Sequence, residues 1–336
     1  MPAERPRIAL VKLSSLGDVI HALPVAATLR AARPEARLSW IVERREATVL
    51  RGHPALDDVI VADTRGWRGA RRPAALRAAL GDALALRRQL VRARFDVVLD
   101  LQGLIKSGVL AAATRAPLRI GFAAGFRREP LSALFANRRV TPPAAARHVV
   151  EQYLALLQPL GAGEPRLEFR LPVTPAAEAA IEEWLATAGF KPHRRLVVLN
   201  PGAGRADKRW PVEHFAALAR GLVQDAGAHV LITWGPGEEA AARAIGAAAA
   251  AMLAPPTDLQ TLPALLRRAS VMVAADTGPL HMAAALGTAC VGLYGPTSAV
   301  RNGPYGPGHR ALASPDGTMA SLSPAAVLAA VVKALG

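Results

Sequence analysis

The chain has 336 residues, 51% hydrophobic and 20% charged, which indicates a globular protein long enough for two domains. It contains no apolar run as long as a membrane span and no apparent signal peptide, and its single cysteine, Cys290, cannot form an internal disulfide; we therefore expect a cytoplasmic protein. The net charge of +15 favours anionic partners, whereas 4% aromatic residues without an RNA-binding signature argue against nucleic acid.

The segment from Ile8 to Pro24, IALVKLSSLGDVIHALP, predicts the first strand, turn and helix of an open α/β sheet. Ile8–Leu13 is apolar except for Lys12, and a turn of small residues follows before a helical pattern begins. Asp18 falls at the carboxyl edge of this strand, where such sheets bind ligands. Its carboxylate could cap the helix or serve as a general base, and the spacing alone favours the cap.

The rest of the N-terminal half alternates strands with helices. We predict strands at residues 37–42, 58–62, 96–101 and 118–122. A long helix is predicted at residues 73–93, with apolar positions at Leu76, Leu80, Leu84 and Leu90. This order predicts a parallel sheet that is covered by helices on both faces.

Two segments of this half concentrate cations. Residues 64–72, TRGWRGARR, are predicted to form a loop with four arginines around Trp67. Such a loop is either solvated or a mobile anion clamp, because arginine binds phosphate and carboxylate groups bidentately. The second group consists of Gln102, Lys106, Arg127 and Arg128. Gln102 and Lys106 follow a predicted strand end, so we expect them at the same edge as Asp18.

Residues 159–175, PLGAGEPRLEFRLPVTP, are rich in proline and glycine and predict a linker. After it, strands predicted at residues 196–200, 229–233, 271–275 and 289–294 alternate with helices. The last helix is predicted to begin at Pro324, with Ser323 as its N-cap. The second half is therefore predicted to be another doubly wound domain.

Three loops of this second domain follow strand ends and are expected to meet at one edge of its sheet. Residues 201–211 offer small residues and Lys208 for a phosphate, without the spacing of a Walker A loop. Glu238 and Glu239 begin a helix, where a carboxylate could accept from ribose hydroxyls or complement the helix dipole. Residues 276–281, DTGPLH, open a helix whose first N–H groups could bind a pyrophosphate. Together these loops predict a nucleotide-diphosphate ligand.

The chain resembles the lipopolysaccharide heptosyltransferases of glycosyltransferase family 9 over nearly its whole length, most of all heptosyltransferase I. The motifs that carry the resemblance are KLSSLGDVIHALP, DLQGLIKSG, REPLSALFANRR, DKRWP, ADTGPLHMAAALG and LYGPT. The resemblance implies an α/β GT-B fold, with two doubly wound Rossmann-like domains facing a central cleft. Residues 1–165 would bind the acceptor and residues 176–336 the nucleotide sugar, and the last helix, 323–335, could pack back on the N-terminal domain.

The same resemblance implies an inverting transfer of L-glycero-D-manno-heptose from ADP-heptose to the Kdo sugar of Kdo-lipid A, without a cofactor or metal. Asp18 would be the general base, and Lys208 would stabilise the charge on the leaving diphosphate. The implied donor-binding residues are Ser15, Gly17, Glu238, Glu239, Asp276, Thr277, Gly278, Leu280 and His281. The implied acceptor-binding residues are Arg65, Arg68, Lys106 and Arg128. The protein would be a monomer, held peripherally on the anionic inner face of the inner membrane.

Some questions stay open at this point. A helix N-terminus lowers the pKa of Asp18, so we expect the acceptor proton to leave late, once the hydroxyl has become acidic. Residues 200–204 read NPGAG where heptosyltransferase I is expected to have threonine-containing residues, so heptosyltransferase II or III or another family 9 transferase stays possible. A GT-B-type epimerase would turn over without an acceptor, and in a non-catalytic binding protein Asp18 would only cap its helix.

Overall fold

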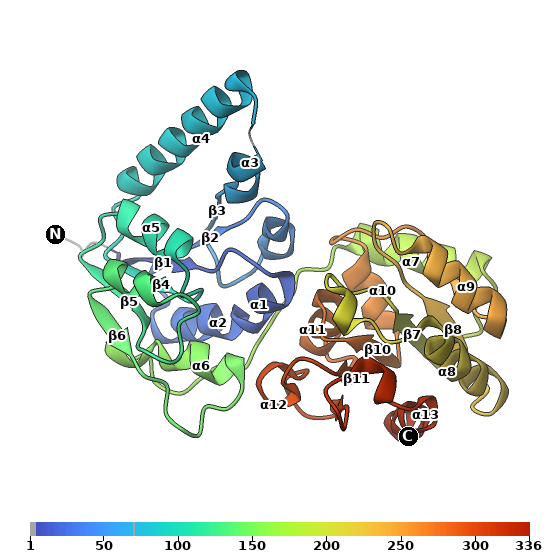
Figure 1. Ribbon diagram of the computed structural model, residues 1–336. Helices are drawn as coiled ribbons and strands as arrows, with labels where there is room; N and C mark the ends of the chain where they lie inside the picture. The colour runs from blue at the N-terminus through green and yellow to red at the C-terminus, as the bar shows by residue number, and fades with distance from the viewer. Residues whose placement is uncertain (1–4, 70) are drawn as a thin grey trace. The chain divides into compact units, whose positions relative to one another are not determined.

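The computed structural model describes residues 5–69 and 71–336, and the chain divides into two compact units, residues 1–170 and 171–336 (Figure 1). The boundary falls within the segment predicted as a linker, and residues 162–174 around it form neither helix nor strand. None of the helices in the described parts of the chain has both the length and the apolar content needed to cross a bilayer.

The N-terminal unit is built on a parallel sheet that has six strands in the described residues, in the order β3-β2-β1-β4-β5-β6. The strands are β1 (Arg7–Val11), β2 (Arg37–Val42), β3 (Asp58–Val61), β4 (Val97–Asp100), β5 (Leu118–Phe122) and β6 (Arg138–Val140). The α-helices are α1 (Leu16–His21), α2 (Leu23–Ala32), α3 (Thr64–Gly69), α4 (Pro73–Arg92), α5 (Ile105–Ala113) and α6 (Val149–Ala155). Short 3₁₀ helices are η1 (Glu46–Leu50), η2 (Pro130–Phe135) and η3 (Gln158–Leu160).

The C-terminal unit repeats this plan, with six parallel strands among the described residues in the order β12-β11-β10-β7-β8-β9. The strands are β7 (Leu196–Asn200), β8 (His229–Ile232), β9 (Met252–Leu253), β10 (Val271–Ala275), β11 (Ala289–Tyr294) and β12 (Arg310–Ala313). The α-helices are α7 (Pro175–Thr187), α8 (Val212–Gln224), α9 (Glu239–Ala249), α10 (Leu262–Arg268), α11 (Gly278–Ala285), α12 (Ala299–Asn302) and α13 (Pro324–Leu335). Two 3₁₀ helices, η4 (Ala206–Lys208) and η5 (Met319–Ser321), complete the unit.

Both strand orders place the first strand of the unit at the centre and wind outwards on either side of it. The winding direction therefore changes between β1 and β4 in one sheet and between β7 and β10 in the other. At such a switch point the loops that follow the two strands diverge, and open α/β sheets bind their ligands there. The fold thus predicts one ligand-binding edge for each unit. It also confirms the predicted α/β class of two doubly wound, Rossmann-like sheets.

The central strands are apolar because both faces of each sheet are covered by helices. In the N-terminal unit β1, α4 and α5 contribute to one core, whose side chains include Val11, Ile41, Leu90, Val98 and Leu110. In the C-terminal unit the corresponding core includes Val197, Phe215, Leu218, Val273 and Val291.

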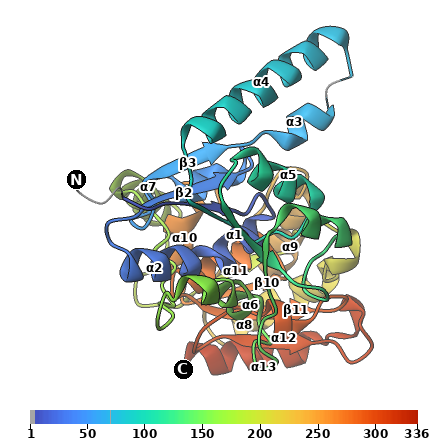
Figure 2. The ribbon, with the colours of Figure 1, turned by 90° about the vertical axis from the view of Figure 1, so that its left-hand side faces the viewer.

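One sequence-based prediction about the helices was wrong. Residues 64–69 form a helix, α3, rather than a loop, because Asp63 caps its first turn with a 3.0 Å bond from the Gly66 N–H and Trp67 packs on the core. Residue 70, also part of the predicted loop, lies outside the described residues. The helix predicted at residues 73–93 is confirmed as α4, whose first part projects beyond the sheet (Figures 1 and 2). Within α4, Leu86 and Leu90 are buried, whereas Leu76, Leu80 and Leu84 are exposed.

The last helix, α13, is part of the core of the C-terminal unit. It begins at Pro324 with Ser323 as its N-cap, as predicted, and it packs on α8, β10 and β11 of its own C-terminal unit. Its side chains Val327 and Val331 are fully buried in that core. The apolar face of this helix thus covers the C-terminal sheet, and packing of the helix on the N-terminal domain stays a prediction.

The packing of α13 predicts its contribution to stability. Val327→Ala should lower the free energy of unfolding by about 2 kcal/mol, because it removes buried methyl groups and leaves a cavity. Val332→Ala, on the exposed side of the same helix, should change it by less than about 0.5 kcal/mol. Equilibrium urea unfolding measures both values. Equal effects of the two substitutions would contradict the burial of Val327.

Candidate active site

Gln102 joins the two loops that diverge at the first switch point. It follows β4, its side chain is buried, and its carbonyl oxygen accepts from the backbone N–H groups of Leu13 (2.9 Å) and Ser14 (3.3 Å). Its amide nitrogen donates to the Ser14 carbonyl at 2.7 Å. One side chain from the β4 loop thus fixes the backbone of the β1 loop immediately before Asp18.

Asp18 caps its helix and is also the centre of a charged cluster. It occupies the first turn of α1 and accepts from the backbone N–H of Ser15 at 3.2 Å and from its hydroxyl at 3.0 Å. The Tyr153 hydroxyl donates to Oδ1 at 3.0 Å, and Arg128 Nη2 lies 3.4 Å from both carboxylate oxygens. The carboxylate needs fewer partners than these to cap a helix, so capping alone does not account for the arrangement.

Lys12 supplies the second cation of this cluster. It follows β1 directly, and its ammonium group is buried, donating to the Tyr153 hydroxyl at 2.6 Å and to the Leu101 carbonyl at 3.1 Å. Its Nζ lies 3.6 Å from Asp18 Oδ1. Burial alone would raise the pKa of Asp18, but the charges of Lys12 and Arg128 and the Ser15 N–H hold that pKa well below its usual range.

The cations predicted to bind an acceptor lie at different distances from this cluster. Arg128 belongs to the cluster. Lys106 lies 3.5 Å from the buried carboxylate of Glu43. The backbone N–H of Glu43 donates to the Leu13 carbonyl, so Lys106 lies at the same edge of the sheet. Arg65, on α3, forms an ion pair with Glu46 of η1 at 3.1 Å. Arg68 is exposed on α3. The structure therefore brings Lys106 and Arg128 to the edge that carries Asp18 and leaves the α3 arginines further out.

Asp276 joins the loops at the second switch point by accepting from two side chains. It follows β10, and its Oδ2 accepts from Lys208 Nζ at 2.8 Å, while Lys208 belongs to η4 after β7. Its Oδ1 lies 2.9 Å from Nε2 of the buried His281 on α11. Burial alone would raise the pKa of Asp276, but the hydrogen bonds and charges of His281 and Lys208 hold it well below the usual range.

The first turn of α11 adds groups that suit an anion. Thr277 precedes the helix, and its buried hydroxyl has no hydrogen-bond partner among the described residues. The N–H groups of Gly278 and Leu280 begin the helix and have no carbonyl partner within it. A helix N-terminus, an orphaned hydroxyl and the Lys208 ammonium thus share one edge of the sheet, which is suitable for binding phosphate.

The structure separates the two adjacent glutamates. Glu238 accepts from the Gly235 N–H at 2.8 Å, and its carboxylate lies so close to Gly202 that a Cβ there would come within 2.1 Å of it. Gly202 belongs to the loop after β7, so Glu238 lies at the switch-point edge. Glu239 instead pairs with Arg243, one turn along the exposed surface of α9. Of the two, only Glu238 is placed beside the anion-binding groups.

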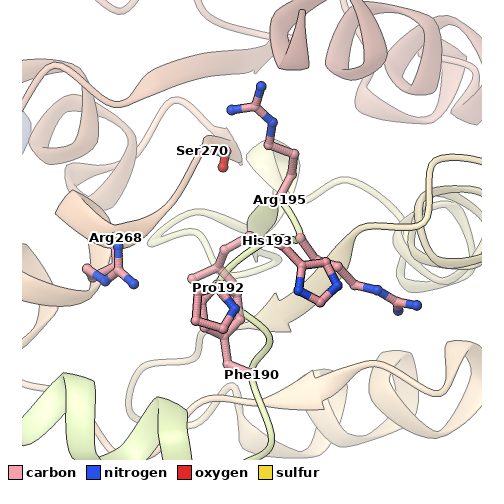
Figure 3. A pocket seen from close by; sticks show the side chains of 8 residues that line it. Phe190, Pro192, His193, Arg195, Arg268 and Ser270 are labelled. Carbon is pink, nitrogen blue, oxygen red and sulfur yellow. The ribbon is translucent and has the colours of Figure 1, made fainter.

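A pocket of about 270 Å³ lies at the opposite edge of the C-terminal sheet, before β7 and β10 (Figure 3). Its cationic side chains do not converge: Arg195 and Arg268 point in different directions, and Arg268 pairs with Glu182. This pocket therefore carries no evident chemistry. Over residues 5–69 and 71–336, no three His, Cys, Asp or Glu side chains are grouped as ligands for a metal ion.

Sequence reasoning missed Lys12, Tyr153 and Glu43 as members of the site. Lys12 carried a signal, because a cation in an apolar strand pattern needs a buried partner. Glu43 carried a weaker one as a carboxylate directly after a predicted strand. Tyr153 lies on α6, 135 residues beyond Asp18 in the sequence, and nothing in its local pattern indicates the contact.

Comparison with known proteins agrees with this geometry. Residues 83–329 match the model of glycosyltransferase family 9 (heptosyltransferase). The chain is 31% identical over 324 residues to lipopolysaccharide heptosyltransferase 1 of Escherichia coli K12, covering 96% of this chain and 98% of that relative.

Solved structures add to the comparison. Escherichia coli heptosyltransferase WaaC with ADP superposes with a TM-score of 0.81 at 30% identity, covering 98% of this chain and 99% of that one. The same enzyme with ADP-2-deoxy-2-fluoro heptose gives 0.78 at 30% identity, covering 97% and 99%. A UDP-GlcNAc 2-epimerase from Neisseria meningitidis, at 10% identity and a TM-score of 0.53 over 97% and 91% of the chains, shares the fold alone.

The Lys12 contact predicts how Asp18 titrates. In the wild type, its carboxyl ¹³C signal should show no protonation between about pH 7 and about pH 4. Lys12→Met should raise the pKa of Asp18 and bring its titration towards this range, because it removes the nearest buried cation. Aspartate-selective labelling, with Asp18→Asn to assign the signal, measures this.

The same shift predicts a dependence of stability on pH. The pKa of Asp18 is lower in the folded chain than in the unfolded chain, so its ionised form stabilises the fold above about pH 4 and loses that contribution as the pH falls further.

An unchanged Asp18 titration in Lys12→Met would show that the ammonium does not control this carboxylate.

Proposed function

This chain belongs to glycosyltransferase family 9, and on that premise we propose that it transfers L-glycero-D-manno-heptose from ADP-heptose to the Kdo sugar of Kdo-lipid A, with inversion at the anomeric carbon. The observation that carries the proposal is the Lys208–Asp276 pair beside the first turn of α11. It is supported by the likeness to a heptosyltransferase that has been solved with ADP and with a fluorinated ADP-heptose.

The C-terminal unit would hold the donor. Its diphosphate would lie at the first turn of α11, where the N–H groups of Gly278 and Leu280 and the Thr277 hydroxyl donate to it. Lys208 would stabilise the negative charge that grows as ADP leaves. Asp276 and His281 keep that ammonium in place, so the stabilising charge is fixed before the reaction begins. Glu238 would accept from the ribose hydroxyls.

Asp18 would take the proton of the acceptor hydroxyl. A carboxylate with so low a pKa is a weak base, so the proton would transfer late, when the bond to the anomeric carbon has largely formed and the hydroxyl has become acidic. Arg128 is half exposed and would turn from Asp18 to the anionic acceptor, which raises the pKa of Asp18 when the base is needed. Lys12 is fully buried and would keep its position.

Acceptor binding would use Arg65, Arg68, Lys106 and Arg128, because Kdo carries a carboxylate and lipid A carries phosphates. Ser15 and Gly17, in the loop and first turn around Asp18, are proposed to contact the donor sugar. We also propose that the protein acts as a monomer on the inner face of the inner membrane, whose anionic lipids attract a chain of net charge +15.

The first test of the proposal is ADP release from ADP-heptose with and without Kdo-lipid A. Release should depend on the acceptor, and Asp18→Asn should lower it by about a hundred- to ten-thousand-fold, because the base is lost. ADP affinity should not change, since the groups proposed to bind the diphosphate and the ribose lie in the other unit. Release without acceptor would favour hydrolysis or epimerisation. Release that requires an acceptor already carrying one heptose would favour heptosyltransferase II chemistry.

The two glutamates provide a matched pair for the donor site. Glu238→Gln should weaken ADP binding by about tenfold, because a charged acceptor for the ribose hydroxyls is lost. Glu239→Gln removes the neighbouring carboxylate and only a surface ion pair, and should leave the affinity unchanged within about twofold. Isothermal titration with ADP measures both. The proposed ribose contact is wrong if the two variants bind equally well.

A further inference from the structure

Three leucines on α4 form an exposed apolar row. Leu76, Leu80 and Leu84 follow one another at intervals of four residues, so they lie on one side of the helix. They are 52%, 62% and 44% exposed, although the same helix buries Leu86 and Leu90 in the core of the unit. Leu76 and Leu80 belong to the first half of α4, whose N-terminal end projects from the N-terminal sheet in both views (Figures 1 and 2), and Leu84 follows one turn later.

The neighbouring elements continue this apolar character. Ile105 and Val109 are exposed one turn apart on α5, and Leu131 and Leu134 are exposed on η2. α4 contacts α5, and α5 packs closely on η2. Of the eleven large hydrophobic side chains exposed among the described residues, seven lie on these three elements. We name these seven the apolar surface: Leu76, Leu80, Leu84, Ile105, Val109, Leu131 and Leu134.

Cations border the apolar surface. On α4, Arg77 directly follows the first leucine, and Arg88 lies one turn beyond Leu84 on the same side. Asp82, the one acidic residue of α4, lies two positions after Leu80 and so points to the opposite side of the helix. An exposed helix with a leucine row and arginines beside it fits a surface of anionic lipid, where apolar side chains enter the interface and arginines meet the headgroups.

We propose that the apolar surface docks the N-terminal unit onto an anionic lipid bilayer, with the leucines of α4 inserted at the level of the headgroups. The inference rests on the proposed function for one step: a lipid acceptor stays anchored in the bilayer, so the base must work close to it. The chain supports this step, because Arg128, which contacts Asp18, lies two residues before η2. The η2 part of the apolar surface therefore begins two residues along the chain from a side chain that contacts the proposed base.

The test is binding of the full chain to vesicles of phosphatidylethanolamine and phosphatidylglycerol, followed by flotation. The triple variant Leu76→Ser, Leu80→Ser and Leu84→Ser should lower the partition coefficient by about tenfold or more. The double variant Leu131→Ser and Leu134→Ser should lower it as well. Val300→Ser with Val332→Ser is the matched control, because these side chains are similarly exposed on the C-terminal unit, and it should bind like the wild type.

Activity separates this proposal from the proposed function. The triple variant should lose turnover on vesicle-embedded Kdo-lipid A but keep it on a deacylated, water-soluble Kdo acceptor. Vesicle binding by the triple variant equal to that of the wild type would overturn the docking surface and leave the transferase intact. If the wild type is a dimer, and the triple variant is a monomer that binds vesicles as well as the wild type does, the surface is a protein interface. That result would also overturn the proposal. If the wild type binds vesicles in a leucine-dependent manner but shows no transferase activity, only the proposed function would be contradicted.

Discussion

The buried ammonium of Lys12 constrains the whole N-terminal site. A charge taken out of water costs several kcal/mol unless neighbouring groups compensate it, so the surrounding chain must supply hydrogen bonds and a counter-charge. Tyr153 from α6, the Leu101 carbonyl after β4 and Asp18 on α1 meet this requirement together. Three distant segments are thereby held at one switch point, and the position of the Asp18 carboxylate follows from how Lys12 is satisfied.

The C-terminal unit also fixes its site with a charged pair, but there the carboxylate rather than the ammonium is the central group. This carboxylate is Asp276, and the cation Lys208 comes from the loop across the switch point. In both units an ion pair and its hydrogen bonds join loops that the sheet topology would otherwise let diverge. Such a pair need not add much net stability, but it fixes where each charge lies. A transferase needs this, because stabilisation by fixed charges is effective only if they do not have to reorganise during the reaction.

The positions of the central strands and the doubly wound class were predictable from the sequence, because buried parallel strands are continuous apolar runs between glycine- and proline-containing loops. The carboxyl-edge location of Asp18 and Asp276 followed from the same rule. The short edge strands β6, β9 and β12 were not predicted. Contacts made over long sequence distances were not predictable: Tyr153 reaches Asp18 across 135 residues. The choice between Glu238 and Glu239 also required coordinates, because it depends on the close approach to Gly202. The apolar spacing in α4 correctly indicated a helix, but it could not show which of its leucines are buried. Periodicity identifies the apolar face of a helix but not the element that packs against it.

The low pKa of Asp18 is consistent with its proposed role once the timing of charge is considered. A base of high pKa would be protonated for part of the time at neutral pH, and in that form it would lose its ion pair with Lys12. A carboxylate held ionised by two cations is always ready to accept, and it needs only an acidic donor. An attacking hydroxyl becomes such a donor as its oxygen gains positive character at the anomeric carbon. The cation that is free to leave, Arg128, is the one matched to an anionic acceptor, so acceptor binding and activation of the base would be the same event.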